Sequence, residues 1–175
     1  MTTELLDLLR RRRSVRVYQA RPVEKEKLSA ILEAVRAAPS AGNLQAFEVI
    51  VIESQERKAA LARAALDQQH VAGAPVLLVF VADPARSASK YGGRGNDLYA
   101  RQDATIACAH AQLAATALGL GCCWVGAFYP DVIRQILNAP TGLEPVALLS
   151  IGYPAEQPDA TDRRPIDDLV RWEGF

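Results

Sequence analysis

The sequence predicts a three-layer domain of the α/β or α+β class, with one β-sheet between two layers of helices. Two observations carry this prediction: short, nearly continuous apolar runs recur along the chain, and segments with helical periodicity separate them. Such runs are typical of strands buried on both faces, so helices must cover both sides of the sheet. The length of 175 residues suits one domain with a substantial core. We therefore expect a single domain over residues 1–175.

The apolar runs place four strands, and the periodic segments between them place five helices. The expected strands cover residues 47–52, 76–82, 122–128 and 146–151. The expected helices are a short leucine-rich helix over residues 5–9, one opened by Pro22 and stopped near Pro39, and helices over residues 55–66, 98–118 and 131–137. The long helix over 98–118 carries small residues on several faces, which indicates a central position or a dimer interface. The glycine-rich polar segment from Asp83 to Asp97 is expected to be a loop that acts as a mobile lid.

Composition excludes several classes of protein. The formal net charge is zero and half of the residues are hydrophobic, which argues against a general nucleic-acid binder. The longest apolar stretch, residues 104–120, is interrupted by His110 and Gln112 and is too broken to predict a membrane span. The three cysteines, two of them adjacent, do not suggest a disulfide framework, and the N-terminus lacks the pattern of a signal peptide. We expect a cytoplasmic protein.

A dense basic run follows the first leucines, where residues 10–16 read Arg-Arg-Arg-Arg-Ser-Val-Arg. Guanidinium is always charged, and its planar fork of donors suits phosphate oxygens. If the segment is extended, Arg12, Ser14 and Arg16 share one face, because strand side chains alternate with period two. Such a face would bind a phosphomonoester. The alternative is a solvated basic surface at a helix end.

Two further segments have side chains that suit a planar ligand. Residues 39–45, Pro-Ser-Ala-Gly-Asn-Leu-Gln, place a hydroxyl and two amides in one loop, and amides can pair with the edge of a heterocycle. Taken alone, a helix-terminating turn accounts for this loop better than a ligand site does. Gly126 and Ala127 would let a planar ligand approach the backbone closely, although a tight strand end needs the same small residues.

Other chemistries find little support in the sequence. His70 and His110 lack metal-ligand spacing, so we expect one at the surface and one in a helix, and we predict no metal site. Cys122 and Cys123 lie in an apolar run and are expected in the core. No pairing of a nucleophile with a base is recognisable. An enzyme with this sequence would therefore depend on a bound cofactor for its chemistry.

Taken in order, these segments resemble the nitroreductase family of FMN-dependent oxidoreductases. The matching segments are Arg12–Arg16, Ala38–Gln45, Gln102–Asp103, Gly119–Phe128, Gly152–Pro154 and Arg163–Pro165. Their order over nearly the whole chain is specific, although each is weak alone. The resemblance implies an α+β fold of three α-β-α layers, with a mixed sheet flanked by helices. It also implies a long central helix at a dimer interface and a C-terminal tail that wraps the partner subunit.

The resemblance further implies a set of cofactor-binding residues and no catalytic side chain, because flavin N5 is the reactive centre. The FMN phosphate would be bound by Arg12, Arg13, Ser14 and Arg16. The partner subunit would contribute Pro39, Ser40, Asn43 and Gln45, and Gly126 and Ala127 would lie under the ring near N5. Arg163, with Arg164 as the alternate, would return to the phosphate or the ring edge. One departure is Thr161, because many members have a basic residue there. The helical insertion of the family also shrinks here to the segment 83–97.

The function implied is that of a homodimer with FMN at the subunit interface. NADH or NADPH would transfer hydride to the flavin, and a small acceptor such as a nitroaromatic or a quinone would receive it. One alternative is an enzyme of the same fold that modifies flavins or tetrapyrrole rings, or a reductive dehalogenase. An alternative of another class is a non-catalytic module that binds RNA or an acidic partner through Arg10–Arg13.

Overall fold

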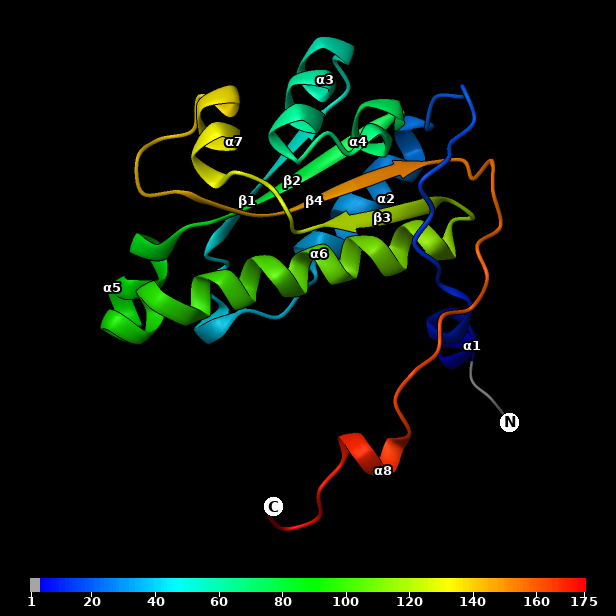
Figure 1. Cartoon of the computed structure of the whole chain (residues 1–175). Coiled ribbons are helices and arrows are strands. Elements are labelled where there is room, and N and C mark those ends of the chain that lie inside the picture. Colours follow the sequence, from blue (N-terminus) through cyan, green and yellow to red (C-terminus); the bar gives the residue numbers. More distant parts are fainter. Residues whose placement is uncertain (1–3) are drawn as a thin grey trace.

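Four antiparallel strands form the centre of the fold, in the order β1-β2-β4-β3 (Figure 1). The structure is a computed structural model that describes residues 4–175. Residues 1–3, where the N-terminus is expected to lack a signal peptide, lie outside the described residues. The strands are β1 (Phe47–Ile52), β2 (Val76–Ala82), β3 (Gly121–Val125) and β4 (Glu144–Gly152). The helices are α1 (Glu4–Arg11), α2 (Lys25–Arg36), α3 (Gln55–Ala64), α4 (Gln69–Gly73), α5 (Pro84–Arg94), α6 (Ala100–Ala117), α7 (Pro130–Leu137) and α8 (Ile166–Leu169).

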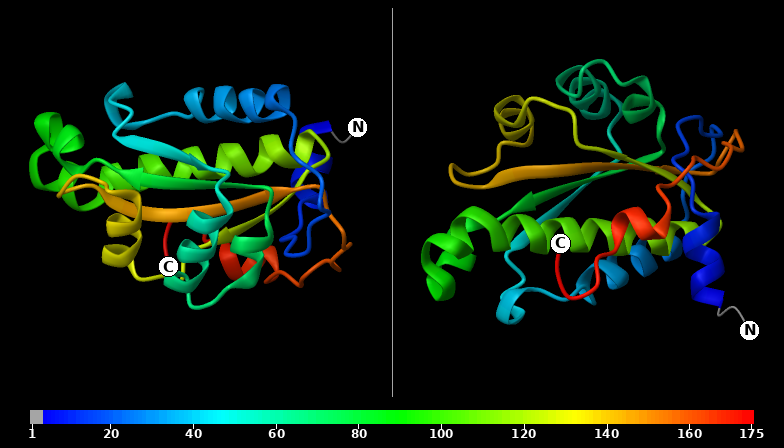
Figure 2. Two further views of the ribbon diagram at one scale, coloured as in Figure 1. Left: turned by 90° about the horizontal axis from the view of Figure 1, so that it is seen from above. Right: turned by 60° about the horizontal axis from the view of Figure 1, so that its bottom comes forward.

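Helices cover both faces of this sheet, so the predicted three-layer α+β architecture is confirmed. The long helix α6 and helix α2 pack on one face, and α3, α4 and α7 pack on the other (Figures 1 and 2). Every residue of β2 is buried, because the strand is central and covered on both sides. Its side chains alternate between the two cores: Leu78 and Phe80 face α2 and α6, whereas Leu77 and Val79 face the other layer.

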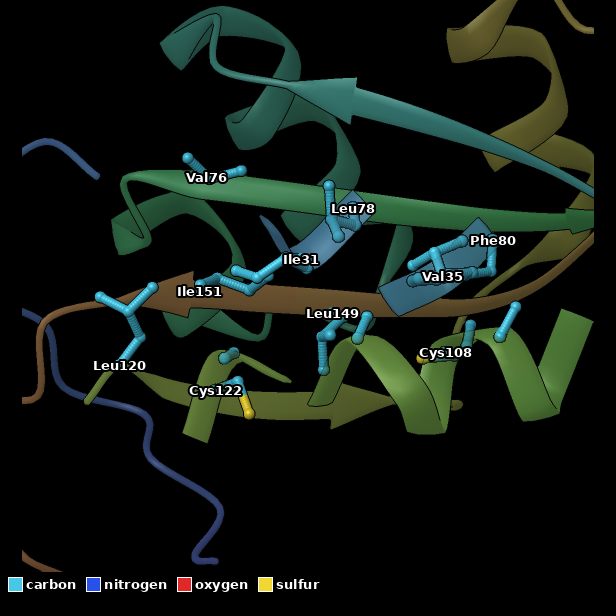
Figure 3. Close-up of a cluster of buried hydrophobic side chains, with 14 of the residues drawn as sticks. Ile31, Val35, Val76, Leu78, Phe80, Cys108, Leu120, Cys122, Leu149 and Ile151 are labelled. Carbon is cyan, nitrogen blue, oxygen red and sulfur yellow. The ribbon is translucent and has the colours of Figure 1, made fainter. Parts of the chain in front are cut away.

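The core beneath α6 depends on small side chains (Figure 3). Ala107, Cys108, Ala111 and Ala115 are fully buried, so the helix lies close to the sheet. Arg101 and Gln102 at its first turn are exposed in the single chain. The helix therefore has the central position that the sequence predicts, with part of its surface left uncovered.

The segment from Asp83 to Asp97 is not the loop that the sequence predicts. It folds into α5 and a following π-helical turn, Gly95–Tyr99. Asp83 caps α5, since its side chain accepts from the Arg86 N–H at 3.0 Å, and Pro84 occupies the first turn. Gly92 takes a positive φ of 54°, which kinks the helix without ending it. The glycines indicated a loop, but the cap and the proline already marked a helix start.

Other element boundaries also differ from the predictions. The helix expected over 55–66 stops at Ala64, because Leu66 and Asp67 have left-handed backbones, and the unpredicted α4 follows. The second helix begins at Lys25, three residues after Pro22. The third strand covers 121–125 rather than 122–128, so Gly126 and Ala127 follow it. The four named strands are antiparallel throughout, and the parallel component of the expected mixed sheet is one isolated bridge, Ser14 to Cys122.

A polar cluster closes the end of the sheet where β4 meets α2. The Glu24 carboxylate accepts from the Tyr153 hydroxyl and from Arg21, both at 2.7 Å. The hydrogen bond from Tyr153 is the main reason that the pKa of Glu24 falls from 4.5 to about 2. A carboxylate whose pKa is lowered by folding stabilises the folded chain only while it is ionised. This cluster therefore favours folding above pH 4.5.

We expect this contribution to be lost as the pH falls from 4.5 towards about 2. Glu24→Gln should flatten that part of the pH dependence of the unfolding free energy, measured by urea titration. Glu26→Gln, an exposed position in the first turn of α2, is the matched control. Equal acid sensitivity in the two variants would contradict the assignment.

Candidate functional site

The arginine-rich segment runs extended along the free edge of β3. Ser14 forms a parallel bridge with Cys122, and the Val15 N–H donates to the Cys122 carbonyl at 3.0 Å. Further on, Tyr18 forms an antiparallel bridge with Pro154 beyond the end of β4. The segment is thus fixed at both ends, and the extended conformation assumed in the sequence analysis is confirmed.

Two glycines of the sheet allow this close approach. A Cβ on Gly121 would lie 2.8 Å from the side chain of Val15, and one on Gly152 would lie 2.9 Å from the ring of Tyr18. Real Cβ atoms are not found at such distances, so larger residues would push the segment away from the sheet. The first residue of β3 and the last residue of β4, both glycines, therefore allow the arginine segment to lie against the sheet.

Glu156 fixes the same segment from the other side. One oxygen of its carboxylate accepts from the backbone N–H groups of Arg16 and Val17, at 2.5 and 3.0 Å. The Ala155 N–H adds a hydrogen bond to the Val17 carbonyl at 2.9 Å. The sequence gives no sign of this role of Glu156, because its partners lie 140 and 139 residues away along the chain.

A pocket of about 660 Å³ opens between this segment and the start of the C-terminal tail. Five arginines and one acidic residue, Asp159, are among the residues that line it. The lining residues are Leu9, Arg10, Arg12, Arg13, Ser14, Arg16, Pro158, Asp159, Ala160, Thr161 and Arg163. The structure thus brings together all four predicted residues of the first segment and Arg163.

Individual arginines differ in how free their guanidinium groups are. Arg13 donates to the carbonyl groups of Arg10 and Arg12 at 2.6 and 3.0 Å, so part of its fork is already used. Arg163 donates to the Thr161 hydroxyl at 2.5 Å. Arg164 does not line the pocket and donates instead to the Asp168 carbonyl at 2.7 Å. The geometry favours Arg163 over Arg164 at this pocket.

The adjacent cysteines lie behind the arginines as part of the core. Cys122 and Cys123 are buried and unpaired, as predicted. Burial raises the pKa of the Cys122 thiol to about 11, although hydrogen bonding by Thr116 and the nearby charge of Arg12 oppose the shift. Thiols that stay protonated are poor nucleophiles, so this burial is consistent with the expected place of these residues in the core.

The second predicted group, the loop of residues 39–45, contains a 3₁₀ turn over Ala41–Asn43. Its polar side chains at Asn43 and Gln45 are exposed, and Ser40 is half-buried. The Ser40 hydroxyl accepts from the Gln45 N–H at 3.0 Å. Gly42 has a φ of 56°, and a Cβ there would lie 2.4 Å from the Tyr91 hydroxyl, so α5 packs directly on this loop.

Within one chain this loop lies far from the arginine pocket. The loop lies beside the first turn of α6, whereas α1, which leads into the arginine segment, lies at the opposite end of that helix (Figures 1 and 2). Residues of α1 and of this segment line the pocket. The 18 residues of α6 span about 27 Å at 1.5 Å per residue. One chain therefore does not gather all the predicted residues around one small ligand.

The third predicted group, Gly126 and Ala127, is exposed in the connection from β3 to α7. The Ala127 carbonyl accepts from the Gln68 amide at 3.1 Å. A Cβ on Gly126 would meet only the Trp124 indole nitrogen within 4 Å, at 3.7 Å. The backbone at this position is open to a ligand.

The two histidines lie outside these groups. His70 was expected at the surface but is half-buried in α4, and burial lowers its pKa. His110 lies in α6, as predicted, with Nδ1 3.2 Å from the Ala34 carbonyl. Among residues 4–175, no cluster of three metal-ligating side chains is found. None of the helices in this range is both long and apolar enough to span a membrane.

Comparison with known proteins identifies the family. A family model described as the nitroreductase family matches residues 9–153, which include the arginine segment, the 39–45 loop and the Gly126–Ala127 connection. The chain belongs to the nitroreductase family. The expectation from the sequence is confirmed.

Individual nitroreductase-family relatives match over most of their own length. An NADH dehydrogenase of Thermus thermophilus is 33% identical, and the alignment covers 93% of this chain and 92% of that protein. An FMN reductase [NAD(P)H] of Bacillus subtilis is 34% identical over 98% of this chain and 74% of its own length. The crystal structure of a nitroreductase family protein from Clostridium difficile superposes with a TM-score of 0.88 at 34% identity, covering 99% of this chain and all of that one.

Proposed function

We propose that this nitroreductase is an FMN-dependent oxidoreductase that uses NADH or NADPH to reduce small acceptors such as nitroaromatics and quinones. The observation that carries the proposal is the arginine pocket, placed in a chain of this family. The name of the Bacillus subtilis relative, an FMN reductase, supports the same cofactor. Residues 1–175 would form one FMN-binding domain.

The residues of the pocket fit the phosphate of FMN. Arg12 and Arg16 supply fixed charge from an extended segment, and Ser14 between them supplies a hydroxyl. Charged hydrogen bonds from guanidinium to phosphate are among the strongest that side chains make. The pocket volume of about 660 Å³ lies in the range of small-molecule sites, which favours a mononucleotide over RNA. Arg10 and Arg11, exposed at the end of α1, would remain solvated charges.

The complete site requires two copies of the chain. The arginine pocket and the 39–45 loop lie at opposite ends of α6, so in a homodimer one subunit would bind the phosphate while the partner's loop reaches the ring. The exposed C-terminal tail would wrap the partner subunit. The unpaired state of all three cysteines suits a cytoplasmic location.

FMN held by these residues would supply the redox chemistry between the nicotinamide and the acceptor. The chain would position the ring and stabilise the charge that develops on it. The exposed backbone at Gly126 and Ala127 would lie against the ring near N5. Arginine side chains would favour the anionic reduced form, since preorganised donors stabilise developing charge. No side-chain nucleophile is needed.

Absorbance spectroscopy of the purified protein tests this proposal. We expect a yellow protein with a flavin band that NADH or NADPH bleaches and that a quinone or nitroaromatic restores. A colourless protein that FMN cannot restore would contradict the function. If flavin is bound but neither nicotinamide bleaches it, the alternative of a flavin-modifying enzyme or a dehalogenase of the same fold is favoured.

A further inference from the structure

Asp103 is a buried carboxylate at the first turn of α6 that the proposed chemistry does not use. Only 2% of the residue is exposed, and no arginine or lysine among residues 4–175 forms an ion pair with it. Its two oxygens accept instead from backbone N–H groups, one from Ala41 at 2.9 Å and the other from Ala46 at 3.4 Å. A buried charge is costly unless hydrogen bonds compensate it, so these contacts specify the position of the carboxylate.

The two N–H groups lie on either side of a strained loop. Gly42, Asn43 and Gln45 have φ values of 56°, 57° and 51°, so three of four consecutive residues have a left-handed backbone. Residues other than glycine rarely adopt this conformation, and it persists only where the surroundings impose it. The Asp103 carboxylate joins the two ends of this loop and so holds it closed.

A second contact fixes the loop from the opposite side. The Arg86 side chain of α5 donates through Nε to the Leu44 carbonyl at 2.5 Å. Arg86 itself is exposed, whereas Asp103 lies in the interior. The loop is thus held between α6 and α5, and its exposed side chains include Asn43 and Gln45, two of the predicted flavin contacts.

We propose that Asp103 is a positioning residue that shapes the 39–46 loop for contact with the flavin bound by the partner subunit. This inference rests on the proposed function, because it concerns the same cofactor. A carboxylate can accept from both N–H groups, whereas an asparagine can accept from one and must turn its own NH₂ towards the other. Asp103→Asn keeps the size of the side chain but removes one of the two hydrogen bonds that hold the loop.

The first test compares Asp103→Asn with Asp97→Asn, which removes an exposed carboxylate from the preceding turn. We expect Asp103→Asn to form dimers but to bind FMN about tenfold more weakly, which corresponds to about 1.4 kcal/mol. It should also shift the flavin absorbance band and speed hydrogen exchange in residues 39–46. Asp97→Asn should match the parent protein. Unchanged FMN affinity in Asp103→Asn dimers would overturn the proposal.

A variant at the surface keeps the proposal testable if Asp103→Asn does not fold. Arg86→Gln removes the contact to the Leu44 carbonyl without opening the core. We expect Arg86→Gln to weaken FMN binding by about threefold, since the loop loses its contact with α5 and keeps its hydrogen bonds to Asp103. An unchanged FMN affinity for Arg86→Gln dimers would then contradict the proposal that these contacts shape the loop for FMN binding.

Hybrid dimers show whether the loop acts across the interface. One subunit carries Arg12→Ala and Arg16→Ala, and the other carries Asp103→Asn. If the loop serves the partner, one of the two sites combines intact arginines with an intact loop, so half of the sites should bind FMN with parental affinity. If the loop serves its own subunit, no parental site exists, and the proposal is overturned. Failure of the parent protein itself to bind FMN would instead refute the proposed function.

Discussion

Replacing Arg12 and Arg16 together with alanine is expected to yield a folded protein that purifies without flavin. Both side chains line the pocket from one face of the extended segment, and the segment itself is held by backbone contacts that alanine keeps. Each charged hydrogen bond lost should cost roughly 1.5–3 kcal/mol of FMN affinity. Since about 1.4 kcal/mol corresponds to a tenfold change in affinity, the double variant should bind FMN at least about a hundredfold more weakly. Titration of apoprotein with FMN, followed by quenching of flavin fluorescence, measures it.

The matched control removes the same charge elsewhere. Arg57 and Arg63 are exposed on α3, on the opposite face of the sheet from α6, and their double alanine variant should retain FMN. Higher salt should weaken binding in the parent more than in the Arg12→Ala/Arg16→Ala variant, because fewer charge contacts remain to be screened. Equal flavin retention in both double variants would place the phosphate away from this pocket.

Much of the fold was predictable because its strands leave nearly continuous apolar runs in the sequence. The runs at 47–52 and 76–82 match β1 and β2 residue for residue, although β2 is buried throughout whereas β1 is buried only at Ile52. An apolar run of this kind is a local pattern that can be recognised in the sequence alone. The segment 83–97 was mispredicted for the opposite reason. Its glycines serve a kink and a close helix contact, at Gly92 and Gly95, and neither has a local signature distinct from that of a loop.

The site shows the same division between local and long-range information. The basic run was recognisable, because five arginines in seven residues need a reason. Glu156 and Asp103 were not assigned their contacts, since their partners lie 140 and 62 residues away along the chain. Both are carboxylates that bind backbone N–H groups, and nothing in the sequence indicates these partners, although Asp103 lies in one of the segments that match the family. The separation of the loop from the pocket is likewise visible only in the folded chain, where they lie at opposite ends of α6.

Truncation after Pro158 is expected to dissociate the proposed dimer. Residues 159–175 are all exposed in the single chain, and among them Trp172 is 88% exposed and Phe175 is fully so. Ile166 and Leu169 of α8 are also uncovered. Exposed apolar side chains gathered in one segment are typical of an interface. Fully burying one such side chain contributes about 1.5–3 kcal/mol. With two tails in a dimer, the dissociation constant should rise at least about a thousandfold, measured by analytical ultracentrifugation.

A point variant separates the tail's role in assembly from its contribution to the pocket. Trp172→Ala/Phe175→Ala leaves Thr161 and Arg163 in place, so it should weaken the dimer without removing a phosphate contact. FMN binding should then depend on protein concentration and recover where dimers re-form, because a shared site exists only in the dimer. A variant that is monomeric by light scattering and still binds FMN with parental affinity would show that one chain completes the site. The 39–45 loop would then have no part in binding, because α6 separates it from the arginines of its own subunit.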